Sequence, residues 1–177
     1  MIKTTLLVIL GLAVLAIAVV LLLATRQPDS FRVERTASIA APPERIFPLV
    51  NDLRQMNSWN PFVKMDPDAS GSYSGPAAGL GAVYDFRGRN SGSMRITQAN
   101  APSRVTMDLH MTGLMETHNT VNFELTPQDG STRVTWSMEG AQPFLAKVMG
   151  VVFNMDQMVG GAFEAGLSDL KTQAEKT

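Results

Sequence analysis

The segment RVTMDLHMT at residues 104–112 alternates apolar and polar side chains, and so do ETHNTVNFELT at 116–126 and STRVTWSME at 131–139. A period of two is typical of strands that bury one face. Turn signals separate the three segments, at Thr112-Gly113 and at Pro127-Gln128-Asp129-Gly130. Connections this short predict that the strands pair in order as an antiparallel meander.

The segments upstream of these strands extend the pattern. Three more stretches have strand-like alternation or composition, and they are Phe31–Ala40, Ala82–Arg87 and Ser93–Ala99. Two short helices are predicted between the first strand and the others, one opened by Pro42-Pro43 and one over Leu53–Trp59. Asp66–Gly81, rich in glycine, serine, proline and alanine, predicts a loop.

The end of the chain changes period. From Phe144 to Leu170 apolar residues recur three and four positions apart, which predicts one long helix with a single apolar face. Its glycines each cost roughly 1 kcal/mol in a helix interior and would allow close packing or a kink. The order of elements predicts an α+β domain in which an antiparallel sheet wraps around this C-terminal helix.

Strand alternation also predicts which side chains face the space between sheet and helix, because successive residues point to opposite faces. In 104–112 this rule places Asp108 and His110 on the outer face. Residues 82–87 fit either parity, and we assign Tyr84 and Phe86 inward. The predicted ligand contacts on the strands and the last helix are Tyr84, Phe86, Met94, Met107, Leu109, Met111, Asn119, Val121, Phe123, Trp136, Met138, Met155 and Val159.

This predicted interior is mostly apolar, with Tyr84, Asn119 and the Trp136 indole as its polar groups. Such a lining is typical of a site for a hydrophobic ligand that one or two hydrogen bonds orient. Trp59 is expected to anchor the second helix to the sheet. The methionines of the last helix are expected to pack between that helix and the sheet.

Several motifs, in register along the chain, resemble the polyketide cyclase/dehydrase and lipid-transport group of the START-like, or SRPBCC, superfamily. They are Ala41-Pro42-Pro43-Glu44-Arg45-Ile46-Phe47, Trp59-Asn60-Pro61-Phe62, Asp66-Pro67, the segment 75–84 and the segment 163–171. The resemblance covers residues 31–174, and Phe62 departs from it where a second tryptophan is common. It implies a helix-grip fold with a deep apolar cavity between the sheet and the long helix. Because such proteins include lipid carriers, hormone and quinone binders and aromatic-ring cyclases, it leaves the reaction open.

The amino-terminal segment has a different character. The apolar run Leu6–Ala24 spans roughly 28 Å at ~1.5 Å per residue, close to the thickness of a bilayer core. It is too long for the apolar part of a cleaved secretory signal, and no Ala-x-Ala site follows it. We therefore expect a transmembrane anchor at residues 1–25, a linker at 26–30 and a ligand-binding domain at 31–174.

The side of the membrane is not set by charge alone. Lys3 and the amino terminus stand before the apolar run, and Arg26, Arg32 and Arg35 stand after it. Because short amino-terminal tails commonly stay inside, we expect a single-pass protein of a bacterial-type inner membrane with its domain on the periplasmic side. The apolar run has no Gly-x-x-x-Gly pairing face, so no oligomeric state is predicted.

The composition excludes several functions. A net charge of −1 without a basic cluster argues against nucleic acid as a partner, and the absence of cysteine excludes a disulfide framework and thiolate metal sites. No phosphate-binding loop or nucleophile elbow is present. His110, Glu116 and His118 have no third histidine or recognisable ligand spacing, so they are expected to be solvated, with no metal site and no cofactor.

The leading hypothesis is a membrane-tethered protein that binds or transports a hydrophobic small molecule such as a lipid, a quinone or a polyketide-like compound. The alternative is a cyclase or dehydratase in which Tyr84, Asn119 or Asp156 handles protons. A second alternative is a ligand-responsive interaction module in which the glycine-marked helix shifts on binding.

Overall fold

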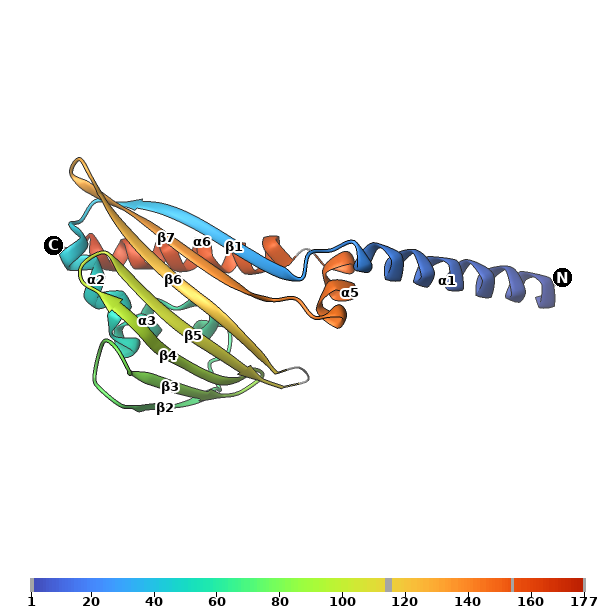
Figure 1. The fold of residues 1–177 in the computed structure, drawn as a ribbon, viewed down its shortest axis with the longest axis horizontal. Helices are drawn as coiled ribbons and strands as arrows, with labels where there is room; N and C mark the ends of the chain where they lie inside the picture. Colours follow the sequence, from blue (N-terminus) through green and yellow to red (C-terminus); the bar gives the residue numbers. More distant parts are fainter. Residues whose placement is uncertain (1, 114–115, 154, 177) are drawn as a thin grey trace.

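A computed structural model describes residues 2–113, 116–153 and 155–176, and within them one seven-stranded antiparallel sheet curves around a C-terminal helix (Figure 1). The spatial order of the strands is β1-β7-β6-β5-β4-β3-β2. The strands are β1 (Ser30–Ile39), β2 (Ser70–Ser74), β3 (Val83–Arg87), β4 (Ser91–Asn100), β5 (Arg104–Thr112), β6 (Thr117–Gln128) and β7 (Ser131–Ala141). The helices are α1 (Ile2–Thr25), α2 (Pro43–Asn51), α3 (Leu53–Trp59), α4 (Pro61–Lys64), α5 (Phe144–Val152) and α6 (Met155–Ala174).

The meander predicted from strand alternation is confirmed. β5 pairs with β6 so that Met107 lies opposite Val121, and β6 pairs with β7 so that Phe123 lies opposite Trp136. All four side chains are on the inner, helix-covered face of the sheet and are buried, whereas their neighbours in sequence face outward. β1 then pairs with β7, which places the first strand beside the last and fixes the order of the sheet.

Two short elements differ from the sequence-based expectation. β2 lies inside the segment 66–81, which was expected to be a loop because Ser70–Ser74 has no apolar alternation. In the structure these residues form an edge strand that pairs with β3. α3 ends at Trp59 as expected, and the short helix α4, which was not expected, begins directly afterwards at Pro61. The Asn60 carboxamide oxygen accepts a hydrogen bond from the Phe62 amide at 3.0 Å, so the residue that ends α3 also caps α4.

The long C-terminal helix predicted at 144–170 is wrong as a single element, because the chain leaves the helical conformation after Val152. Phe153 is extended, with φ −118° and ψ 133°. The run Val151-Val152-Phe153 combines β-branched and aromatic residues, which restrict side-chain rotamers in a helix. The break lets α5 pack against α1, while α6 alone lies along the inner face of the sheet (Figure 1).

The core lies between α6, the sheet and the short helices. Trp59 is fully buried, and its indole N–H donates to the Leu49 carbonyl at 2.9 Å, so it anchors α3 as expected. Its ring meets the edges of Phe123 and Trp136, with centroids 5.9 Å and 5.6 Å away. α6 contributes Phe163, Leu167 and Leu170 to the same core.

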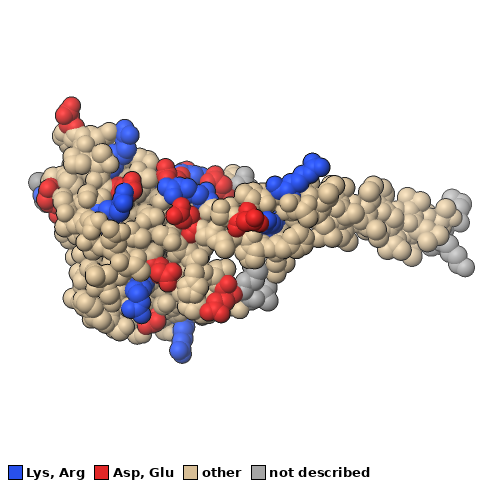
Figure 2. All heavy atoms as spheres, viewed as in Figure 1, with Lys and Arg blue, Asp and Glu red and all other residues tan. Residues whose placement is uncertain are grey.

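α1 projects away from this domain, and its segment Thr4–Thr25 is long and apolar enough to cross a membrane. Length and composition alone support this, and a signal sequence has the same properties. Figure 2 shows the acidic and basic side chains gathered over the domain, with a tan surface along most of the projecting helix.

Candidate functional site

The inner face of the sheet divides into a closed part and a more open part. The closed part is the layer of Met107, Val121, Phe123 and Trp136, none more than 2% exposed. α6 covers it over β7, where the Trp136 ring stacks on Phe163, and α2 covers it over β5 and β6. These four predicted ligand contacts are therefore part of the closed hydrophobic core.

The more open part is a row of side chains that crosses the sheet at one end. Tyr84 pairs with Met94, Met94 with Leu109, and Leu109 with Asn119, so four strands contribute one residue each. Tyr84, Met94 and Leu109 are half-buried although they face inward. The row continues through Gly140 to the start of β1, and so it lies at the sheet end nearest α1.

The next inward step along the strands lies still closer to this end. Phe86 pairs with Gly92, and Gly92 with Met111. The Phe86 and Met111 side chains are half-buried. Met138 on β7 lies further from this end, opposite Val121, and is also half-buried. We call the inward-facing side chains Tyr84, Phe86, Met94, Leu109, Met111 and Met138 the anchor-end surface.

An aromatic ladder forms one side of the anchor-end surface. The Tyr73 and Tyr84 rings lie 4.7 Å apart, and Phe86 follows at 5.9 Å from Tyr84. Asn57 donates to the Tyr73 hydroxyl at 2.9 Å, and the Arg54 guanidinium lies 4.1 Å above the same ring. The ladder is thereby held from the α3 side, which orients Tyr84 toward the inner face.

The polar groups expected in the interior occupy different environments. Burial raises the pKa of Tyr84 above its usual 10.0, with a smaller effect from neighbouring Tyr73, so its hydroxyl stays protonated and able to donate. Asn119 is buried against Gly140 and donates to the Thr117 hydroxyl at 3.4 Å. The buried Trp136 indole N–H has no acceptor among the described residues, and leaving such a donor unpaired costs ~1–3 kcal/mol.

The helical part of the predicted site is only partly as expected. Val159 is half-buried and packs against the core. The side chain of Met155 lies outside the described part of the chain. Met149 and Met158 were expected to pack against the sheet, but they are 45% and 63% exposed because the helix breaks before α6.

An inward-facing arginine was missed in the sequence. Arg35 lies opposite Trp136, and its Nε donates to Glu164 at 2.7 Å while Nη2 donates to Asp156 at 3.0 Å. The hydrogen bond from Arg35 lowers the pKa of Asp156 below its usual 3.8. Asp156 is thus a helix-to-sheet tie, held ionised, and poorly suited to donate a proton. The alternation that places Val33 inward would also have placed Arg35 inward.

The comparisons with known proteins agree with this architecture. A family model described as polyketide cyclase / dehydrase and lipid transport matches residues 30–175. No curated protein matches the sequence. The fold is similar to that of protein CV1439 from Chromobacterium violaceum, with a TM-score of 0.60 and 15% identity over 85% of this chain and 100% of the other.

Two further solved structures have the same fold. Ara h 8.0201 gives a TM-score of 0.56 at 15% identity and covers 81% of this chain and 99% of its own. The di-domain ARO/CYC BexL from the BE-7585A biosynthetic pathway gives 0.63 at 16% identity, over 88% of this chain and 53% of that one. At such identities the likeness establishes the fold alone. Because the family model covers most of the chain, this protein belongs to the polyketide cyclase/dehydrase and lipid-transport family of START-like proteins.

Proposed function

We propose that this protein binds a hydrophobic small molecule, such as a lipid, a quinone or a polyketide-like compound, on the anchor-end surface while α1 holds it at a bilayer. The observation that carries the proposal is the half-buried apolar row at the sheet end nearest α1. Inward-facing side chains in a finished core are normally almost fully buried. This surface has instead kept apolar area that a ligand would cover.

The polar groups near the row suit a ligand with one or two polar atoms. The Tyr84 hydroxyl is held protonated by burial, so it would donate to a carbonyl or hydroxyl oxygen. The unpaired Trp136 N–H lies deeper in the interior and would gain from any acceptor that reaches it. Most of the lining is apolar, so burial of hydrocarbon would supply most of the affinity.

The contact between α1 and α5 supports a retained anchor. The two helices pack against each other. Just beyond α1, the linker residue Asp29 pairs with Lys147 of α5 at 2.5 Å and accepts a hydrogen bond from the Gln142 amide at 2.7 Å. Ala24 at the end of α1 is fully buried. Removal of α1 as a signal sequence would uncover this interface.

α5 also presents an apolar surface beside the anchor. Its large exposed side chains and those of the turn after it are Phe144, Leu145, Met149, Val152 and Phe153. An exposed apolar patch continuous with a membrane-spanning helix is suited to the boundary between headgroups and acyl chains. In this position the anchor-end surface would lie close to the bilayer that dissolves the ligand, which raises the local ligand concentration.

A cyclase or dehydratase is the second candidate, and the family membership favours it. Such an enzyme would fold a reactive chain against the same surface, with Tyr84 as proton donor and Asn119 as a hydrogen-bonding group. Tyr84→Phe separates the two functions. Loss of turnover with retained binding would indicate chemistry, and unchanged turnover would remove this hydroxyl from the mechanism.

The binding experiment uses the full chain extracted in mild detergent or in nanodiscs, followed by native mass spectrometry and a panel of lipids and quinones. We expect bound apolar molecules in the wild-type protein. Leu109→Gln, on the anchor-end surface, should weaken uptake on the order of tenfold, because burial of one leucine is worth ~1.5–3 kcal/mol. Arg95→Gln on the exposed outer face is the matched control and should bind as the wild type does.

Wild-type protein that is empty after extraction and takes up nothing from the panel would contradict the proposal. Equal uptake by Leu109→Gln and wild type would move the ligand away from the anchor-end surface. Hydrogen exchange over residues 144–170, with and without ligand, tests the interaction-module alternative. A ligand-dependent change confined to α5 and the first turns of α6 would favour it.

A further inference from the structure

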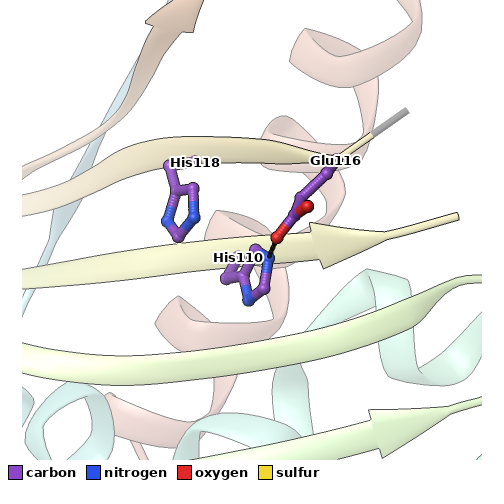
Figure 3. A group of neighbouring side chains, drawn as sticks. All are labelled: His110, Glu116 and His118. Atoms are coloured by element: carbon purple, nitrogen blue, oxygen red, sulfur yellow. Dashed lines mark hydrogen bonds and ion pairs between the residues drawn. The ribbon is translucent and has the colours of Figure 1, made fainter.

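Two histidines and a glutamate lie together on the outer face of the sheet, opposite the anchor-end surface (Figure 3). His110 of β5 pairs directly with His118 of β6, and Glu116 precedes His118 by two residues, so all three point to the same face. The His110 Nε2 lies 2.7 Å from the Glu116 carboxylate, and one ligand atom from each residue lies within 4.8 Å of the others.

The imidazole rings are already positioned beside each other. They are parallel to within 3°, with centroids 4.2 Å apart. Ligands of a tetrahedral zinc ion lie roughly 3.3 Å apart, because each bond is ~2.0–2.1 Å long. The in-plane lone pairs of two parallel rings do not meet at one point, so binding one ion requires both rings to turn about χ1 and χ2. The exposure of His118 and Glu116 permits this movement, and His110 is half-buried.

A fourth residue orients one of the ligands. The Asp108 carboxylate lies 3.4 Å from His118 Nδ1. A carboxylate on one ring nitrogen leaves the other nitrogen as the metal ligand and makes it more basic, as in carboxylate–histidine–zinc arrangements. The sequence did not predict a metal site here, because it has no third histidine and no recognisable ligand spacing. Alternation along β5 nevertheless indicates the carboxylate partner, because it places Asp108 and His110 on the same outer face.

The surroundings leave room for further ligands of an ion. A hollow of about 630 Å³ adjoins His110 on the same face, between β2 and β5. Its lining is polar and includes Asp85, Ser93 and Thr112. Ligands from one side and an open hollow on the other are typical of a site that keeps coordination positions for water or a small ligand.

We propose that His110, Glu116 and His118 bind a divalent first-row cation, with Zn²⁺ as the best fit, and that Asp108 positions His118. Two imidazoles and one carboxylate suit Zn²⁺ better than Ca²⁺ or Mg²⁺, which prefer all-oxygen ligands. The metal site lies on the face of the sheet opposite the anchor-end surface, so the result of its test does not depend on the proposed function.

The test uses the untagged full chain in detergent, freed of metal by chelation, with Zn²⁺ alone as the probe in isothermal titration calorimetry. We expect one ion per chain. His110→Ala and His118→Ala should each weaken binding more than tenfold, and Asp108→Asn should weaken it 10–100-fold as an orienting residue does. Glu116→Gln is the safest variant for folding, because its side chain is 70% exposed, and it should also weaken binding. Glu124→Gln, elsewhere on the outer face of β6, is the matched control.

A second readout is independent of affinity. The chain has only two histidines, so the proton spectrum of their imidazoles should show both resonances shift together as Zn²⁺ is added. Co²⁺ should give the visible absorption of a bound ion in the wild type and not in Glu116→Gln. Zinc affinity equal in wild type, His110→Ala and His118→Ala, or binding that moves neither imidazole, would overturn the proposal.

Discussion

Trp136 of β7 and Phe163 of α6 stack face to face, with ring centroids 4.1 Å apart and planes 8° from parallel. Trp59 meets the Trp136 edge at 5.6 Å, so three elements converge on one aromatic cluster. The cluster fills the space between sheet and helix at the middle of β7. Toward α1, among the described residues, Tyr84 and Phe86 stack only within their own ladder and not on a ring of α6, and the anchor-end surface is half-buried.

Gly166 is required for this close approach of α6 to the sheet. A Cβ at this position would lie 2.7 Å from the Trp136 ring and 2.8 Å from Pro61. We expect Gly166→Ala to lower the free energy of unfolding by ~1–3 kcal/mol through overpacking. Urea unfolding followed by tryptophan fluorescence measures this change.

Gly161→Ala in the same helix is the control, because nothing lies within 4 Å of its added Cβ. It should raise the free energy of unfolding by up to about 1 kcal/mol through helix propensity. Equal effects of the two substitutions would show that the Trp136 contact does not limit the packing of α6.

The tie between Arg35 and Asp156 should depend on pH. The pKa of Asp156 is below its usual 3.8 in the folded protein, mainly because Arg35 donates a hydrogen bond to it. Such a group stabilises the fold above its unfolded pKa, and the contribution is lost as the pH falls through the folded value. Asp156→Asn should therefore melt below wild type at neutral pH and approach it as the pH falls below 3.8 and through the lowered folded pKa. A difference in melting temperature that persists unchanged at low pH would argue against this ion pair.

Tyr84 should ionise only at high pH. Burial raises its pKa above 10.0, and absorbance titration of tyrosinate follows the change. The part of the absorbance change that Tyr84→Phe removes should lie above pH 10.0. An apolar ligand on the anchor-end surface should move that part further up, because it would exclude more water from the hydroxyl. An absorbance change assigned to Tyr84 below pH 10.0 would contradict the assigned burial.

Retention of α1 can be measured on the mature protein. We expect its intact mass to include residues 1–25 and the membrane-bound fraction to resist extraction at high pH, as spanning helices do. Lys147→Ala should leave the chain in the membrane but raise hydrogen exchange in α5, because it removes the pair with Asp29. A mature chain that begins after Thr25 would instead identify a signal sequence.

Local patterns of the sequence predict much of this fold. The period of two in residues 104–139 specifies three strands and their buried faces, because one register alone puts Met107, Phe123 and Trp136 on the same side. The apolar run Leu6–Ala24 likewise specifies a helix suited to a bilayer. Motif resemblance then identified the family, which the match over residues 30–175 confirms.

Other features exist only through contacts between distant segments. Ser70–Ser74 becomes a strand because β3 pairs with it, and nothing in its own composition indicates this. The break between α5 and α6 accompanies packing of α5 on α1, which the helical spacing of 144–170 does not reveal.

The candidate sites show the same division. Strand alternation determined which residues of β4 to β7 face inward, since side-chain direction is a local property of the backbone. It left β3 open, and pairing of Tyr84 with Met94 places Tyr84 on the inner face. The tertiary structure alone decided which of these the core would cover, because burial depends on where α6 and Phe163 come to lie. It also decided that His110 and His118 stack within reach of Glu116, since cross-strand register is set by the whole sheet and not by either strand.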